Sequence, residues 1–174
     1  MRAPMRLLFL AVTACILTAC NAPDTVMENG AITLDGNQVT LRVAGSPKAT
    51  IYADGAFAID GNTVATTPAE RSLLARYNQS VRSVHDTGLV MGKAGVRMAT
   101  RAVVAGTSST PDSADKVAEA GVGQMEKLNL DICRATASIK TTQDQLATQL
   151  ATFKPYASIV DASDVTDCES DAKS

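Results

Sequence analysis

The feature that most constrains the fold is a change of hydrophobic periodicity at residue 67. Before it, apolar residues recur at every second position, the period of a β-strand. After it they recur at alternating spacings of three and four, the period of a packed helix. The boundary carries Thr67-Pro68-Ala69-Glu70, a capping box with proline at the first helical position. The sequence therefore predicts an α+β chain, with an antiparallel sheet first and long helices after it.

Residues 31–66 are predicted to form a four- or five-stranded antiparallel β-meander. The segments 34–39 and 59–64 share the order apolar, Asp, Gly, Asn, any residue, Val, which predicts that one hairpin solution occurs twice. A calcium site is the alternative for these turns, but the full loop spacing of oxygen ligands is absent. Three Asp-Gly dipeptides supply the positive φ angles of tight turns: Asp35-Gly36, Asp54-Gly55 and Asp60-Gly61.

Residues 67–154 are predicted to form a long antiparallel helical hairpin, with a turn at 107–112 and an end at Pro155. The first helix contains three glycines, and each lowers helix propensity by about 1 kcal/mol relative to alanine. Close approach of the second helix would offset that cost, so we predict these glycines as helix-packing positions. They are Gly88, Gly92 and Gly95.

The same glycines are also compatible with three different roles. The hairpin could self-associate through them, or the first helix could break near residues 86–88. Insertion into a membrane is a third role, because small residues at such spacings pack helices in bilayers. Lys93, Arg97 and Arg101 interrupt this stretch and disfavour insertion.

The N-terminus is typical of a bacterial lipoprotein. Residues 1–19 combine early arginines, a short apolar run and small residues, as a secretory signal does. They end in Leu17-Thr18-Ala19, directly before Cys20, so Cys20 is predicted as the acylated first residue of the mature chain. Residues 20–30 would be a tether, and Asn21 favours the outer membrane, facing the periplasm. The alternative is an ordinary secretory signal with a chance cysteine.

Two cysteines remain once Cys15 is removed with the leader and Cys20 is acylated. They are Cys133 and Cys168, and the envelope outside the inner membrane is oxidising. We predict that they form a disulfide that pins an acidic tail, residues 155–174, along the second helix. Unpaired thiols, or a metal site that includes the lone histidine His85, are the alternatives. The tail has few apolar residues, so its order is predicted to depend on the bridge.

Composition and motifs argue against several function classes. The mature chain has 14 basic and 18 acidic residues, no tryptophan and 3% aromatic residues overall, which disfavours binding of nucleic acid. No hydrolase, phosphate-loop or zinc motif occurs. His85 and Asp86 are adjacent on a helix and are not expected to form a dyad. We therefore expect no enzyme, cofactor or metal.

The block from residue 41 to residue 102 resembles the YggN-like family of bacterial envelope proteins of unknown function. The resemblance rests on the strand pair at 51–57 and 59–64, followed by a Glu-Arg helix start and Tyr77. It implies an envelope location and the order sheet then helices, and it supplies no catalytic residue or ligand.

Two function classes remain. The first is a membrane-anchored lipoprotein with a structural or protein-interaction role, either with an envelope protein or with itself. The second is a lipoprotein that binds a lipid or small ligand in a cavity between the sheet and the helical hairpin, which a lining of Met91, Met98 and Met125 would favour.

Overall fold

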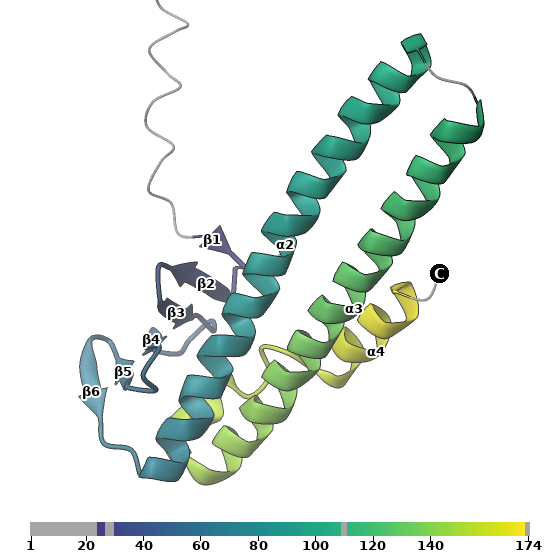
Figure 1. Cartoon of the computed structure of the whole chain (residues 1–174). Coiled ribbons are helices and arrows are strands. Elements are labelled where there is room, and N and C mark those ends of the chain that lie inside the picture. The colour runs from purple at the N-terminus through teal and green to yellow at the C-terminus, as the bar shows by residue number, and fades with distance from the viewer. Residues whose placement is uncertain (1–23, 27–29, 109–110, 173–174) are drawn as a thin grey trace, which may run out of the picture.

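Figure 1 shows a computed structural model of the chain, which describes residues 24–26, 30–108 and 111–172. A meandering antiparallel sheet is followed by two long antiparallel helices and two shorter C-terminal helices, so the predicted α+β order is confirmed. The strands are β1 Asp24–Thr25, β2 Ile32–Asp35, β3 Gln38–Leu41, β4 Ala49–Ile51, β5 Phe57–Ile59 and β6 Asn62–Val64. The helices are α2 Pro68–Ser108, α3 Pro111–Gln149, the 3-10 helix η2 Ala151–Tyr156 and α4 Ala162–Asp171.

Strands β2 to β6 form the predicted meander, and each strand pairs with the next. The two-residue strand β1 adds a sixth strand by pairing with β2, Asp24 opposite Leu34. Asp24 and Thr25 therefore belong to the sheet, whereas the prediction placed them in the tether 20–30.

The two similar Asp-Gly-Asn hairpins do not share one register, so the prediction of a repeated hairpin is wrong in detail. In the first, Asp35 pairs with Gln38. In the second, Ile59 pairs with Asn62, one residue earlier in the shared pattern. The second loop needs positive φ at both Asp60 (47°) and Gly61 (82°), as a type I′ turn does. A shift of one residue moves every side chain to the opposite face, so the buried face of each hairpin selects its register.

Helix α2 begins where the sequence predicts. The Glu70 amide donates to the Thr67 hydroxyl at 3.2 Å, and the Thr67 amide donates to the Glu70 carboxylate at 2.7 Å. The helix then runs without interruption to Ser108, so no break occurs near residues 86–88. Its partner α3 ends at Gln149, five residues before the predicted end of the hairpin at 154.

The core explains this early end of α3. Leu150 is extended (φ −114°, ψ 99°), and the chain turns into η2. This turn places the Phe153 ring 5.9 Å from the rings of Phe57 and Tyr77 and 5.8 Å from that of Tyr156. These four rings are fully buried and join the sheet, α2 and η2. Packing of large aromatic side chains contributes more than the helix propensity of a few residues.

Buried polar side chains hold the elements together. The Asn78 side-chain amide on α2 donates to the carbonyls of Asn37 at 2.9 Å and Ile51 at 3.0 Å, which joins the helix to the sheet. The Tyr156 hydroxyl donates to the Pro47 carbonyl at 2.6 Å. These bonds satisfy groups that would otherwise be costly to bury.

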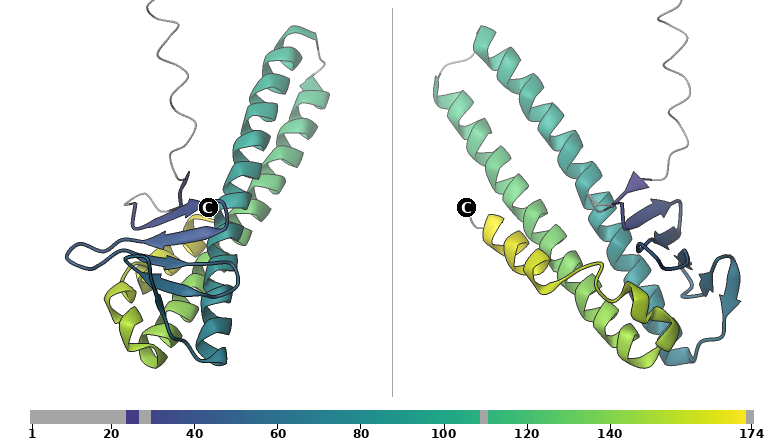
Figure 2. Two further views of the ribbon diagram at one scale, coloured as in Figure 1. Left: turned by 90° about the vertical axis from the view of Figure 1, so that its left-hand side faces the viewer. Right: turned by 180° about the vertical axis from the view of Figure 1, so that it is seen from behind.

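The sheet covers only the half of α2 that starts at Pro68 (Figure 2). The core cluster ends on α2 at Val81, with Val84 packed against it, and begins on α3 at Ile139. Beyond these residues the two helices project together past the sheet (Figure 2). We call this projecting part, residues 86–108 of α2 and 111–127 of α3, the distal hairpin.

Candidate functional site

The distal hairpin carries most of the large apolar side chains that are exposed in the described part of the chain. Six large apolar side chains are exposed among the described residues, and five of them lie on it. Val96 and Val122 are 69% and 66% exposed. The others on the distal hairpin are Leu89, Val90 and Val104. Single exposed apolar residues are ordinary on a protein surface, but a group of them on one projecting element indicates an interaction surface.

Three basic side chains lie among these apolar ones on α2. Lys93, Arg97 and Arg101 are spaced by four residues, so they share one side of the helix. All three are exposed, and in the described part of the chain none of them has an ion-pair partner. At 3.6 residues per turn, the basic and apolar side chains together cover an arc of about 140°.

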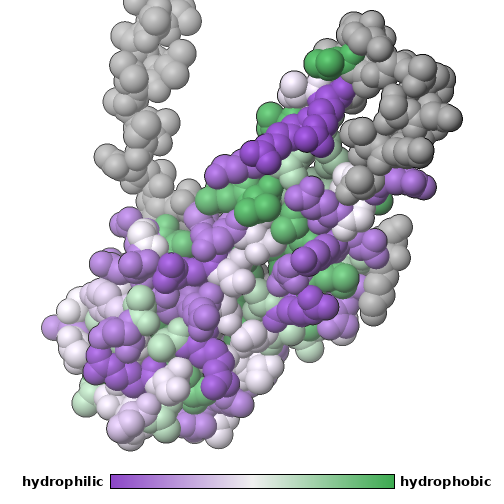
Figure 3. Space-filling view, in the orientation of Figure 1, coloured by the Kyte–Doolittle hydropathy of each residue, from purple (hydrophilic) through white to green (hydrophobic). Residues whose placement is uncertain are grey.

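We call this arc the α2 face. It consists of Leu89, Val90, Lys93, Val96, Arg97, Arg101 and Val104. In the space-filling view, apolar and hydrophilic side chains lie next to each other along the projecting part of α2 (Figure 3). The arc points away from α3, because the positions that contact α3 are on the other side: Gly95 lies near Met125, and Met98 lies against Gly121.

The predicted helix-packing role of the glycines in α2 is wrong at two positions. A Cβ atom added at Gly88 or Gly92 would have no heavy atom of the described residues within 4 Å, apart from its chain neighbours and the nearby backbone of α2 itself. At Gly95 it would be 3.8 Å from the Met125 methyl carbon, an ordinary contact. The close approach is made instead by Gly121 on α3, where an added Cβ would clash with the Met98 side chain. The sequence signal for this contact was a glycine, Gly121, within the apolar pattern of the second predicted helix.

These contacts also bear on the predicted ligand cavity. Met98 packs on Gly121, and Met125 packs near Gly95, so both fill the interface between α2 and α3. The surface depression between the two helices lies nearer the sheet and is polar. It is lined by serines and arginines, among them Ser80, Ser138 and Arg134. The Ser80 and Ser138 hydroxyls are hydrogen-bonded at 2.8 Å.

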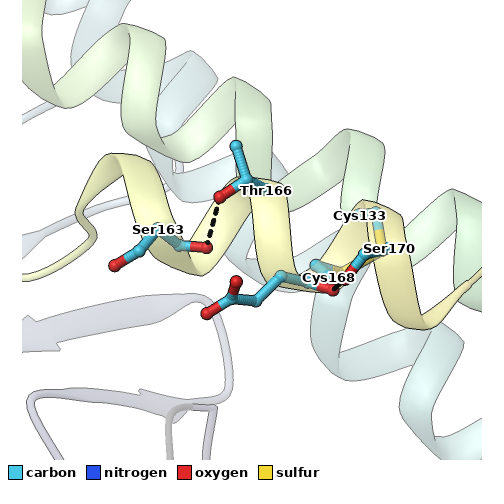
Figure 4. Close-up of a disulfide and its surroundings, with 6 residues drawn as sticks. Cys133, Ser163, Thr166, Cys168 and Ser170 are labelled. Atoms are coloured by element: carbon cyan, nitrogen blue, oxygen red, sulfur yellow. Dashed lines mark hydrogen bonds between the residues drawn. A yellow bond between two sulfur atoms is a disulfide. The ribbon is translucent and has the colours of Figure 1, made fainter.

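The predicted cysteine pair is present as a disulfide between α3 and α4 (Figure 4). Cys133 is buried, with 3% of its surface exposed, and its Cα lies 5.5 Å from that of Cys168. Helix α4 has no buried residue of its own. The bridge is therefore the covalent attachment of α4 to α3, and Ala172, directly after the helix, is buried. Cys20, the predicted lipidation site, lies outside the described residues.

The acidic tail contains a helix, α4, that the sequence analysis did not predict. Asp161 caps α4: its carboxylate accepts from the Asp164 amide at 3.0 Å, and the Asp164 carboxylate accepts from the Asp161 amide at 2.8 Å. Hydrogen bonds from Ser163 and then from Asp164 lower the pKa of Asp161 below its usual value. Two aspartates three residues apart after an apolar pair were the sequence signal for this helix start.

A second attachment of the tail precedes α4 and was not predicted. Gln143 on α3 is fully buried, and its amide nitrogen donates to the carbonyls of Ala157 and Val160, both at 2.7 Å. Its carbonyl accepts from the Val160 amide at 3.2 Å. Residues 156–160 are thus held by the core and not by the disulfide alone.

The described residues contain little that resembles a reaction centre. The His85 ring lies 3.1 Å from the Asp86 carboxylate, so the expectation that these adjacent side chains cannot meet is wrong. In the described part of the chain, no group of three or more His, Cys, Asp or Glu side chains is placed to hold a metal ion. Within the same residues, no helix combines the length and apolar character needed to cross a membrane.

Among the described residues, one buried polar side-chain atom lacks a hydrogen-bond partner. The Tyr77 hydroxyl is inaccessible to solvent and makes no hydrogen bond in the structure. Burial raises the pKa of Tyr77 well above its usual value, because the ionised form would lose its hydration. The group lies in the aromatic core and affects stability; it does not reach the α2 face.

Comparisons with protein-family models, curated proteins and solved structures find no match to this chain.

Proposed function

We propose that this protein is a membrane-anchored lipoprotein of the bacterial envelope with a non-catalytic role, structural or interactive, carried out by the distal hairpin. The observation that supports it most is the concentration on that projecting element of exposed apolar side chains and of basic side chains that have no ion-pair partner among the described residues. The core lies at the other end of the molecule, so substitutions on the distal hairpin can change binding without unfolding the protein.

The anchor in this proposal is Cys20. Acylation of a lipoprotein cysteine adds several hydrocarbon chains, and stable membrane attachment needs at least two. The disulfide supports the location, because such bonds persist in oxidising compartments such as the periplasm. Asn21 favours the outer membrane, facing the periplasm, and the resemblance to the YggN-like family implies an envelope location.

The ligand-binding alternative is less well supported. It requires a cavity between the sheet and the helical hairpin that Met98 and Met125 help to line, whereas both methionines pack between α2 and α3.

Two measurements test the proposal. Metabolic labelling with a fatty-acid analogue should label the protein and should fail with Cys20→Ala. Continued labelling of that variant would contradict acylation at Cys20. Photo-crosslinking in intact cells should capture a membrane or protein component from a probe at Val96 or Val122. A probe at exposed Thr141, on α3 beside the core, is the matched control. Equal capture from both regions would contradict the role of the distal hairpin.

A further inference from the structure

The charge of this protein is unevenly distributed. Residues 87–108 contain three basic residues and no acidic residue. The whole mature chain has a net charge of about −4, from 14 basic and 18 acidic residues, so the remainder carries about −7. Helix α4 and its cap are the opposite extreme, with five acidic residues and no basic one between 161 and 171. A negatively charged molecule held beside an anionic surface will therefore turn its α2 face toward that surface.

The strand that follows the predicted anchor in sequence is the edge strand β1. β1 is the edge strand nearest the distal half of α2, and β6 is the edge strand farthest from it (Figures 1 and 2). The four residues from Cys20 to Asp24 span at most about 14 Å when fully extended. If Cys20 is acylated, the membrane surface lies within that reach of β1.

The α2 face also has the composition of an element that binds at a membrane surface. Lys93, Arg97 and Arg101 offer three cations to lipid headgroups, and neighbouring leucine and valine side chains offer apolar area to the acyl boundary. Each basic residue near an anionic lipid surface strengthens binding roughly fivefold.

A second copy of the chain fits this face less well. Two α2 faces packed on each other would bring like charges together. The acidic α4 of another copy would be complementary, but α4 lies on the side of α3 away from α2 (Figures 1 and 2). That contact would be head-to-tail and would leave faces uncovered in an open assembly.

We propose that the α2 face docks on an anionic phospholipid surface, that of the membrane in which the acyl chains of Cys20 are held. This inference rests on the proposed lipid anchor and names the partner of the distal hairpin. Docking would lay the hairpin along the membrane and leave α4, with its acidic side chains, away from it.

Vesicle binding by the mature chain with Cys20→Ser, made with its disulfide intact, tests the inference without an acyl group. We expect the protein to sediment with vesicles of phosphatidylcholine containing about one third phosphatidylglycerol, and to bind neutral vesicles weakly, with binding that declines as salt is added. The variant R97Q/R101Q should bind the anionic vesicles roughly 30-fold more weakly. The control K48Q/K154Q removes the same charge from exposed sites beside the core and should bind like the parent.

A fluorescence measurement locates the contact. The chain has no tryptophan, so Val96→Trp introduces a single reporter on the α2 face. Its emission should shift to shorter wavelength with anionic vesicles, because the indole enters the apolar boundary. Tyr52→Trp, at the exposed position on the sheet, should show no shift.

Three results would overturn the docking. They are equal binding to neutral and anionic vesicles, equal weakening in the two charge variants, and a reporter at residue 96 that shifts only as the protein self-associates, which would make a second copy the partner. Failure of the vesicle assay leaves the lipid anchor intact, since that assay needs no acyl chain. Continued fatty-acid labelling of Cys20→Ala would instead contradict the proposed lipid anchor and would leave the vesicle result unchanged.

Discussion

Removal of the disulfide should destabilise the protein and release α4 alone. The perturbation is C133S/C168S, which deletes a bridge between residues 35 apart in sequence. A closed loop of about 36 residues restricts the unfolded chain by about 13 cal/mol/K, or about 4 kcal/mol at 25 °C, in the chain-entropy model. For a chain of this length we expect the melting temperature to fall by about 8–16 °C.

The structure also predicts where the release stops. Residues 156–160 are held by Gln143 and by burial of Tyr156 and Val160, whereas α4 has no buried residue. Hydrogen exchange should therefore lose protection over residues 162–172 and keep it over 143–160. This boundary corrects the expectation from sequence that the whole tail depends on the bridge.

The assay combines thermal unfolding with hydrogen exchange read by mass spectrometry. Reduction of the parent protein should reproduce both effects. Ala135→Ser is the matched control, because it places a hydroxyl at a neighbouring buried position of α3 without breaking the bridge. A melting temperature unchanged by C133S/C168S, with full protection of α4, would show that contacts other than the bridge hold α4 and would refute this reasoning.

Three further predictions follow from the buried polar groups. Tyr77→Phe removes the unpartnered hydroxyl and should raise the free energy of unfolding, measured by denaturant titration, by about 1–3 kcal/mol. The control Tyr52→Phe, at an exposed position, should change the free energy of unfolding little. A loss of stability in Tyr77→Phe would show that the hydroxyl has a partner. Gln143→Met leaves the Val160 amide and two carbonyls unpaired and should lower the free energy of unfolding by about 1–3 kcal/mol, with exposed Gln149→Met as the neutral control. Burial raises the pKa of Tyr77 in the folded state, so the unfolded state loses its proton first and the stability should fall as the pH rises above about 10. Tyr77→Phe should reduce this alkaline loss, and an identical pH dependence in that variant would assign the loss to other groups.

Local hydrogen bonding and hydrophobic period were enough to predict the order of the fold. The side chains of Thr67 and Glu70, three residues apart, each accept a hydrogen bond from the other's backbone amide. The four residues 67–70 are therefore enough to specify the start of α2. The disulfide was also predictable, because the predicted cleavage of the leader and acylation of Cys20 leave one possible pair of thiols in an oxidising compartment. The glycines of α2 were visible in sequence too, but not the side of the helix to which they point.

Tertiary structure decided the features that depend on distant partners. The two similar hairpins take different registers, because the buried face of each strand and not its turn residues selects the pairing. α3 ends early because Phe153 packs on the rings of Phe57 in the sheet and Tyr77 in α2, and Tyr156 packs on Phe153. The α2 face exists because the core stops at Val81 and Val84 while the helix continues to Ser108. Periodicity marks which residues of a helix could be buried; only the packed chain determines where their partners end.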